Sequence, residues 1–466
     1  MLRDHSWADY AGRRITIMGL GSFGGGEGAV RFLAERGARL TISDQRSAQQ
    51  LGETMSRLAD VPITRWSLGG HREEDFLHAE LVVVNPAVIR QHPWLVWCRA
   101  RGIPLTSEMN LFWQHQRGTI LAVTGSNGKS TTTALLHHML RTAGLRTWLG
   151  GNLGRSLLPH VDQIQPGDFV VLELSSFQLL DLDRLQVSPH GAIVTNFTPN
   201  HLDWHTSLEH YRYAKQTILR WQTSRDWYVL PADDPELSHW RGRGRRIVYR
   251  LLRETAASTS DTEATLQQTV LHSLQLPGEH NLRNALAAAT AAQQLGIRSE
   301  QIGQALKTYQ PLPHRLQHIA HWQGRDFYND SLATTPESTQ AALRAFSRPL
   351  IVLVGGYDKH LDLAPLCREL ALRAKGVVLI GQTAPSLYAS LQALPSRQAW
   401  VSSPQPDLSS ALKTAIAQSA AGDVIVLSPA CASYDWFKNY ADRGEQFTRL
   451  VHHWIAQHAE SMSAAA

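Results

Sequence analysis

TILAVTGSNGKST, residues 119–131, joins a short apolar segment to a glycine-containing loop and then to a lysine with hydroxyl residues. Residues 119–123 have the length and composition of a buried β-strand, and the residues after Gly128 favour a helix that ends at Gly144. A buried strand, a glycine loop and a helix in this order are typical of parallel sheets covered by helices. The stretch therefore predicts an α/β fold.

The same loop has the composition of a phosphate-binding site. Glycines let backbone N–H groups approach phosphate oxygens, Lys129 supplies a positive charge, and Ser130 or Thr131 can reach Mg²⁺. The spacing is two residues shorter than G-x-x-x-x-G-K-[ST], and a solvated loop is the less favoured alternative. We expect nucleotide phosphates to bind at Gly125, Ser126, Asn127, Gly128, Lys129, Ser130 and Thr131.

Strand and helix signals alternate on both sides of this loop and form three blocks. A chain of 466 residues has room for about three domains. We place the domains at 1–117, 118–311 and 312–466, and we read the polar segment 241–268 as irregular. The apolar runs predict parallel strands at 14–18, 39–43, 80–84, 119–123, 169–174, 191–195, 350–354, 376–380 and 423–427.

The first block contains a second glycine motif. Residues 19–24, GLGSFG, match G-x-G-x-x-G after a strand, and Asp44 ends the next strand. Alone, this pattern indicates an NAD-dependent oxidoreductase, and a tight structural turn is the simplest alternative. However, any nucleoside diphosphate, including UDP, can use such a turn. Two nucleotide-type loops in successive blocks favour two phosphate-bearing ligands.

Glu173 is the only acid in the apolar stretch 170–179, VVLELSSFQL. A buried carboxylate needs a cation or hydrogen bonds, and Mg²⁺ bound to a nucleotide would supply the cation. The alternative is a carboxylate that caps backbone groups. His201 and His205 lack the further ligands of a zinc site, so their spacing alone is weak evidence for metal binding.

Composition excludes several other classes of protein. The formal net charge is +5, and residues 241–246, RGRGRR, form the only dense basic patch, for which we favour a solvated loop over a nucleic-acid contact. The three cysteines form no CxxC pair, which favours a reducing, cytoplasmic setting. We identify neither a signal peptide nor a membrane span, and we expect a monomer with no nucleic-acid or membrane partner.

Several segments together resemble the Mur ligase family. TGSNGKST is similar to the family's phosphate loop, and LELSSFQL, residues 172–179, resembles the form found in members that add glutamate. Further matches cover all three blocks in the same order. They are NFTPNHLDWH (196–205), YRYAKQTI (211–218), PGEHNLRNALAA (277–288), PLPHR (311–315), NDSLATTP (329–336) and LSPACASYDWFKNYADRGEQF (427–447).

The resemblance implies a Rossmann-like N-terminal domain for a UDP-linked substrate. It also implies a central P-loop-type ATPase domain for ATP and Mg²⁺, and a Rossmann-like C-terminal domain for the incoming amino acid. Residues that match the UDP-substrate site are Ser22, Phe23, Asp44, Gln45, Arg46, Ala87 and Asn152, and those that match the amino-acid site are His314, Lys359, Ser433, Tyr434 and Tyr440.

The resemblance also implies the catalytic set. Lys129, Glu173, His201 and Lys215 match catalytic positions, and Asn281, Arg315 and Asp330 join the phosphate loop around ATP. Ser130 and Glu173 would bind one Mg²⁺, while His201 and a carbamylated Lys215 would bind a second. Without the resemblance, Lys215 would be read as a surface helix lysine.

The sequence departs from the family at several positions. Leu332 and Thr335 replace the lysine and asparagine of the family's NDSKATN segment, and Ala87 replaces a common glycine. Loss of a cation beside a reacting phosphate would cost on the order of 1–3 kcal/mol without compensation. The departure leaves the stereochemistry of the amino acid open.

The activity implied is ATP-dependent addition of D-glutamate to UDP-N-acetylmuramoyl-L-alanine through an acyl phosphate, in cytoplasmic peptidoglycan precursor synthesis. One alternative is the same fold adding L-glutamate or another acidic amino acid. A second is the NAD-dependent oxidoreductase, and a third is a catalytically silent nucleotide-binding protein. The joint presence of Lys129, Glu173, His201 and Lys215 argues against the last of these.

Overall fold

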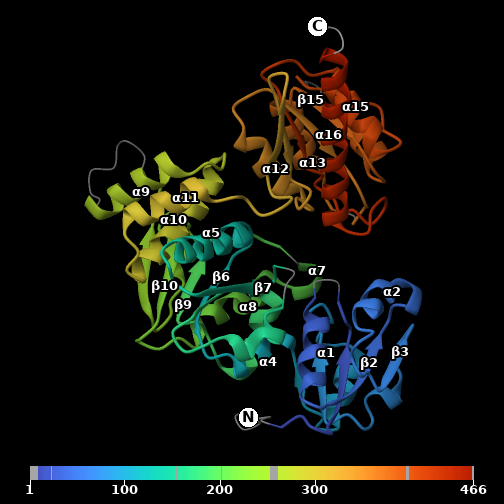
Figure 1. Cartoon of the computed structure of the whole chain (residues 1–466), viewed down its shortest axis with the longest axis vertical. Coiled ribbons are helices and arrows are strands. Elements are labelled where there is room, and N and C mark those ends of the chain that lie inside the picture. The colour runs from blue at the N-terminus through green and yellow to red at the C-terminus, as the bar shows by residue number, and fades with distance from the viewer. Residues whose placement is uncertain are drawn as a thin grey trace. The chain divides into compact units, whose positions relative to one another are not determined.

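The computed structural model describes residues 9–21, 24–153, 156–200, 202–251, 261–359, 361–394 and 398–463. These residues form two compact units. One comprises Met1–Leu274 with Arg283–Thr308, and the other comprises Gln275–Leu282 with Tyr309–Ala466. The first unit contains two β-sheets and the second contains one, and helices flank the strands of each sheet (Figure 1).

The first sheet has five parallel strands in the order β3-β2-β1-β4-β5. Its strands are β1 (Arg14–Met18), β2 (Arg39–Asp44), β3 (Arg65–Leu68), β4 (Leu81–Val84) and β5 (Leu105–Thr106). Its helices are α1 (Gly25–Glu35), α2 (Ala48–Arg57), α3 (Pro93–Ala100) and α4 (Glu108–His115). The three strands predicted here are confirmed, with β4 starting one residue late.

The second sheet has six parallel strands in the order β11-β10-β9-β6-β8-β7. They are β6 (Thr119–Thr124), β7 (Thr147–Gly151), β8 (Phe169–Glu173), β9 (Gly191–Val194), β10 (Trp227–Pro231) and β11 (Arg245–Tyr249). The helices around them are α5 (Lys129–Thr142), α6 (Ser176–Leu185), α7 (Leu202–His205), α8 (Leu208–Arg220), α9 (Asp261–Ser273), α10 (Glu279–Gln294) and α11 (Ser299–Thr308).

The prediction that residues 241–268 are irregular is wrong. Arg245–Tyr249 form β11, which pairs with β10, and Asp261–Ser273 form α9. Because β11 lies at the edge of the sheet, it can expose Arg245 and needs no continuous apolar run. Arg245 and Arg246 therefore belong to a strand and not to the solvated loop expected for the RGRGRR patch.

The third sheet has the order β12-β13-β17-β14-β15-β16. Its strands are β12 (Gln317–Trp322), β13 (Arg325–Asn329), β14 (Leu350–Val354), β15 (Gly376–Leu379), β16 (Trp400–Val401) and β17 (Val424–Leu427). Its helices are α12 (Pro336–Ala345), α13 (Ala364–Arg373), α14 (Ala384–Gln392), α15 (Leu408–Ala417) and α16 (Tyr440–Ser463).

The strands predicted in this sheet, β14, β15 and β17, are parallel as expected, whereas β12 and β13, which were not predicted, pair antiparallel. Gln323 and Gly324 join them with φ values of 48° and 76°. Positive φ at both central residues is the geometry of a tight hairpin turn, and glycine is the residue that favours it. The other pairings in this sheet are parallel.

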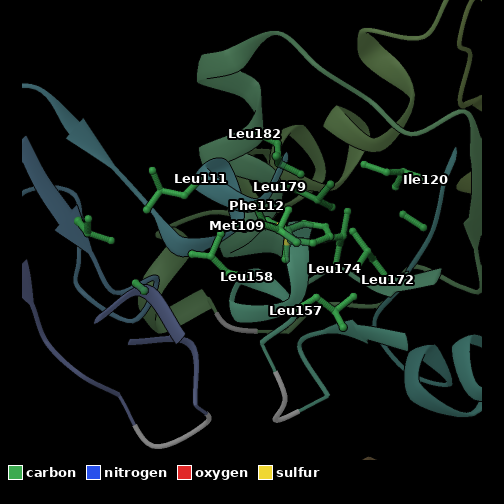
Figure 2. Packing of buried hydrophobic residues seen from close by; sticks show 14 of the residues in the cluster. Met109, Leu111, Phe112, Ile120, Leu157, Leu158, Leu172, Leu174, Leu179 and Leu182 are labelled. Carbon is green, nitrogen blue, oxygen red and sulfur yellow. The ribbon is translucent and has the colours of Figure 1, made fainter. Parts of the chain in front are cut away.

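The first two sheets share a continuous apolar core. Met109, Leu111 and Phe112 of α4 belong to the same buried cluster as Leu172 in β8 and Leu179 in α6 (Figure 2). This packing holds the carboxyl end of β8, and with it the phosphate loop after β6, in a fixed frame.

Helix α16 is the longest helix that the structure describes, with 24 residues, but it carries charged residues along its length. Among the described residues, no helix combines the length and apolar composition needed to cross a membrane.

Candidate active site

The phosphate loop lies between the carboxyl end of β6 and the first turn of α5, as predicted. Gly125 and Gly128 have φ values of 149° and 79°, which L-residues with a Cβ rarely adopt. A Cβ at Gly125 would lie 1.9 Å from Thr195 Oγ1, and one at Gly128 would lie 2.2 Å from Asn284 Oδ1. Both glycines are therefore required by close packing as well as by conformation.

The segment after β9 braces this loop. Thr195 Oγ1 and Asn196 Nδ2 donate to the Asn127 carbonyl at 2.6 and 3.0 Å, and Asn127 N donates to Asn196 Oδ1 at 2.9 Å. Ser126 Oγ donates to the Thr198 carbonyl at 2.7 Å. The contacts of Ser126 and Asn127 thus fix the shape of the loop. The buried residues Ser130 and Thr131 lie next to the loop, in the first turn of α5.

Two lysines converge on one carbonyl group of the loop. Lys129 Nζ donates to the Gly125 and Ser126 carbonyls at 3.1 and 2.9 Å, and Lys215 Nζ donates to the Gly125 carbonyl at 2.7 Å. Lys215 comes from α8 and is 1% exposed, so it is not the surface lysine that the helix pattern alone would suggest. Burial, reinforced by the charge of Lys129, holds the pKa of Lys215 well below the ordinary lysine value.

Glu173 is the last residue of β8, which pairs with β6, the strand before the loop. The prediction had the strand continue to residue 174. Its side chain is buried, and Asn152 Nδ2 donates to Oε1 at 2.8 Å. Ser175 begins α6 through a reciprocal cap with Gln178, which fixes the chain just after Glu173. Glu173 Oε2 is buried and has no hydrogen-bond partner among the described residues.

This arrangement fits a magnesium ion. Mg²⁺ prefers oxygen ligands, and the orphaned Glu173 Oε2 together with the hydroxyls of Ser130 and Thr131 provides oxygen donors. Within the described ranges no cluster of three His, Cys, Asp or Glu side chains forms a complete protein cage. The few protein oxygens are typical of a magnesium site whose other ligands are nucleotide phosphates and water. His201 lies outside the described residues.

The first-sheet motif differs from a dinucleotide site at its acid. Asp44 Oδ2 accepts from Leu20 N and Arg46 Nη2, each at 2.9 Å, and Oδ1 accepts from Arg46 N at 2.9 Å and Nε at 3.1 Å. A carboxylate offers about four acceptor positions. All are filled by protein N–H groups, so Asp44 has none left for ribose hydroxyls, which argues against the oxidoreductase.

The other residues predicted for this site lie beside strands of both sheets of the first unit. Gln45 is exposed after β2, and Ala87 N donates to Asn85 Oδ1 at 3.0 Å in the turn after β4. Asn152 lies at Glu173, as described above. Ser22 and Phe23 lie outside the described residues.

In the second unit, a polar cluster forms where β13 ends. Asp330 accepts from Leu316 N at 3.0 Å and from Ser428 Oγ at 2.8 Å, and burial raises the pKa of Asp330 to about 7. His314 has a φ of 63° and its Nδ1 lies 3.0 Å from Asn329 Nδ2. The positive charge of Arg315 acts on Asp330 and partly offsets the rise in its pKa.

The predicted amino-acid residues lie around this cluster and a small neighbouring pocket. Lys359 lines that pocket with Tyr357, Thr383 and Cys431. Ser433 is buried and Tyr434 is 59% exposed. Tyr440 makes a backbone contact, because its carbonyl accepts from Ser331 Oγ at 2.7 Å. Asn281, which was predicted for ATP, donates from Nδ2 to the Pro277 carbonyl at 2.8 Å.

Sequence comparison identifies the family. Residues 13–107 match the Mur ligase MurD-like N-terminal domain, residues 123–292 match the Mur ligase middle domain, and residues 314–431 match the Mur ligase glutamate ligase domain. A curated relative from Roseiflexus sp. (strain RS-1), named UDP-N-acetylmuramoylalanine--D-glutamate ligase, is 39% identical over 95% of this chain and 98% of its own. The chain belongs to the Mur ligase family.

Other relatives agree with this assignment. A protein of the same name from Geobacillus kaustophilus (strain HTA426) is 37% identical over 95% of this Mur ligase and 98% of its own chain. Among solved structures, the UDP-N-acetylmuramate-alanine ligase MurC from Thermotoga maritima aligns with a TM-score of 0.62 and 20% identity, covering 94% of this chain and 99% of its own. That likeness supports the fold.

Several residues of this Mur ligase site were not predicted. Thr195, Asn196 and Asn284 pack against the phosphate loop although they lie far from it in sequence. Arg443 is 1% exposed and donates to Ser331 Oγ and O, each at 2.9 Å, and burial lowers its pKa to about 10. The position of Asn196 just after a strand end, and that of Arg443 inside an apolar helix face, are the signals that could have identified these two residues.

Proposed function

We propose that this Mur ligase adds D-glutamate to UDP-N-acetylmuramoyl-L-alanine, with ATP as the source of free energy. The observation that carries the proposal is the buried Glu173 Oε2, which has no hydrogen-bond partner in the described part of the chain, beside a glycine loop that two lysines contact. The curated relatives with this activity in their names match nearly the whole chain. The proposed setting is peptidoglycan precursor synthesis in the cytoplasm, by a monomer.

The chemistry requires activation of a carboxylate. The terminal alanine carboxylate attacks the γ-phosphorus of ATP, which forms an acyl phosphate and releases ADP. The glutamate amine then attacks the acyl carbon, loses a proton and expels phosphate, which leaves a new amide. Such a reaction depends mainly on positioning and on neutralising the negative charge of the reactants.

The phosphate loop supplies that positioning. The N–H groups of Ser126 and Asn127 donate to Asn196, and the loop leads into the amino end of α5, where an anion is favoured. Lys129 now caps loop carbonyls and is within reach of phosphates bound over them. Asn281, Arg315 and Asp330, which belong to the second unit, are the further residues that we propose for ATP binding.

Glu173 with Ser130 or Thr131 would hold one Mg²⁺, and His201 with Lys215 a second. When bound, Mg²⁺ neutralises charge on the phosphate oxygens. A carbamate on Lys215 would form when its neutral amine attacks CO₂, with a new N–C bond and loss of one proton. The lowered pKa of Lys215 supports that reaction, because only an unprotonated amine is nucleophilic.

The substrate ends have separate proposed sites. The UDP end would use Ser22, Phe23, Gln45, Arg46, Ala87 and Asn152, with Asp44 holding Arg46 in place. Glutamate would use His314, Lys359, Ser433, Tyr434 and Tyr440. We propose domain boundaries at 117/118 and 311/312, which separate these three functions.

An amino-acid panel tests the proposal. Phosphate release should require UDP-N-acetylmuramoyl-L-alanine, ATP and D-glutamate together, and L-glutamate should support little turnover. Failure with both glutamate enantiomers would contradict the proposal. Preference for the L-enantiomer would retain amide ligation and shift the specificity, which Leu332 in place of a lysine makes worth testing.

A further inference from the structure

Strand β11 lies at an open edge of the second sheet and has no role in the mechanism above. Its only neighbour among the described strands is β10, with which it pairs in parallel. Arg245 N donates to the Asp226 carbonyl at 2.8 Å, and the Tyr249 carbonyl accepts from Ala232 N at 2.7 Å. These two bonds identify the residues of β11 whose backbone groups face β10.

The alternate residues of β11 direct their backbone groups away from the sheet. The N–H and C=O groups of successive strand residues point to opposite edges, so those of Arg246 and Val248 face outward. Within the described part of the chain, neither residue forms a hydrogen bond on that side. Such an edge is a template for a further strand. The partly exposed side chains of Ile247 and Val248 give that strand an apolar surface to pack on.

Arginines without ion pairs surround this edge. Residues 241–250 contain five arginines and no acidic residue. None of the five forms an ion pair within the described ranges, because the nearby acids have other partners: Asp226 contacts His190 at 3.0 Å, and Glu236 contacts Arg212 at 2.5 Å. The exposed arginines are Arg241, Arg243, Arg245 and Arg250. The edge of β11 therefore carries a positive charge that the described chain does not balance.

We propose that the open edge of β11 binds an extended acidic segment of a partner protein, which adds a strand to the second sheet. The backbone of the segment supplies acceptors for the outward N–H groups and donors for the outward C=O groups. Its carboxylates pair with the exposed arginines. In this mode of recognition the backbone bonds provide affinity and the side chains provide selectivity.

Other anionic partners match the edge less well. The phosphates of nucleic acids and lipids accept hydrogen bonds but donate none, so the outward carbonyls of Arg246 and Val248 would lose water without gaining a donor. A second copy of this chain, paired edge to edge, would bring arginines against arginines, and like charges directly opposite each other destabilise a strand pair. An acidic peptide satisfies the backbone groups and the charge together.

Peptide binding by the full chain tests the proposal. The probe is a fluorescein-labelled peptide of alternating threonine and glutamate, and the comparison probe is a labelled thymidine oligonucleotide of equal net charge. Val248→Pro removes an outward N–H and keeps the pairing with β10, since proline is tolerated where the N–H faces away from a sheet. A double variant, Arg243→Glu with Arg245→Glu, reverses two charges. The control is Arg39→Glu, at an exposed position that starts β2.

Fluorescence anisotropy should show saturable peptide binding to the wild type and to Arg39→Glu, and it should be tighter than oligonucleotide binding. Val248→Pro should weaken peptide binding by at least about threefold, and the double arginine variant by at least about tenfold, with wild-type circular dichroism spectra.

Two results with the wild type would overturn the proposal: no saturable peptide binding, or oligonucleotide binding as tight as that of the peptide. A folded Val248→Pro variant that binds the peptide like the wild type would also overturn it, because the edge would then recognise charge alone. If Val248→Pro does not fold, the comparison of the two probes decides.

Discussion

The side-chain nitrogen of Lys215 lies 2.7 Å from the carbonyl oxygen of Gly125, inside the phosphate loop. Lys129 donates to the same oxygen at 3.1 Å. Two ammonium groups on one carbonyl repel each other, and the buried one is the costlier to keep charged. The contact therefore favours a neutral amine at Lys215, next to the site proposed for phosphate transfer.

Replacing Lys215 with methionine should stabilise the protein and abolish turnover. Methionine has a similar length and removes the cost of burying an amine. We expect the free energy of unfolding to rise by on the order of 1–3 kcal/mol at pH 7 in CO₂-depleted buffer. Chemical denaturation and a phosphate-release assay measure the two effects.

The sign of the pH dependence follows from the lowered pKa of Lys215. The unfolded chain holds its lysine proton up to a pH of about 10.4, whereas the buried amine gives it up earlier. The cost of burial is therefore largest at low pH and fades as the pH approaches 10. A methionine variant that is equally stabilised at pH 7 and pH 10, or that retains turnover, would contradict this account.

Glu173→Gln should show whether turnover needs the negative charge of this side chain or only its shape. Glutamine fills the same space and still accepts from Asn152, but it lacks the negative charge that a carboxylate brings to a magnesium site. Turnover should fall by at least about 100-fold, with little change in thermal stability. The control is Glu80→Gln on the surface, which should alter turnover less than about twofold. Magnesium-dependent phosphate release that survives in Glu173→Gln would remove Glu173 from the metal site.

Gly125→Ala should destroy the phosphate loop. The added Cβ would meet Thr195 Oγ1 at 1.9 Å, in a backbone conformation that alanine rarely adopts. We expect loss of ATP binding and destabilisation by about 2–4 kcal/mol. Gly52→Ala is the matched control, because it lies in α2 with open space around it and should stabilise the protein by about 0.5–1 kcal/mol. ATP binding by Gly125→Ala at wild-type affinity would refute the role of the loop.

These loop residues also show what could be read from the sequence. Apolar runs placed β1 and β14 at the observed residues, and the glycine-lysine pattern located the loop before α5. Local composition is sufficient there, because buried strands and glycine turns depend on residues close in the chain.

The features that the sequence did not predict depend on contacts between residues far apart in the chain. Asn196 and Asn284 contact the loop across large sequence separations, which no local pattern records. The alternation of β11 is obscured by its edge arginines, and the burial of Lys215 depends on how α8 packs on β6. Helix periodicity could not distinguish that lysine from a solvated one.

Asp330→Asn should change the pH dependence of stability. Burial raises the pKa of Asp330 to about 7, so its stability contribution is present at low pH and lost as the pH rises through 7. Asparagine does not ionise, and the Ser428 hydroxyl can accept from its amide. The variant should gain stability relative to the wild type between pH 5 and 8, by on the order of 2–4 kcal/mol. Unfolding curves whose difference is independent of pH would exclude a raised pKa.

We propose that ATP activates the substrate carboxylate by phosphorylating it. The most direct test uses UDP-N-acetylmuramoyl-L-alanine with ¹⁸O in its terminal carboxylate, together with ATP, Mg²⁺ and D-glutamate. Mass spectrometry of the released phosphate should find one ¹⁸O atom per new amide, because the acyl phosphate bridge carries that oxygen to phosphorus. Amide formation with unlabelled phosphate would contradict the account.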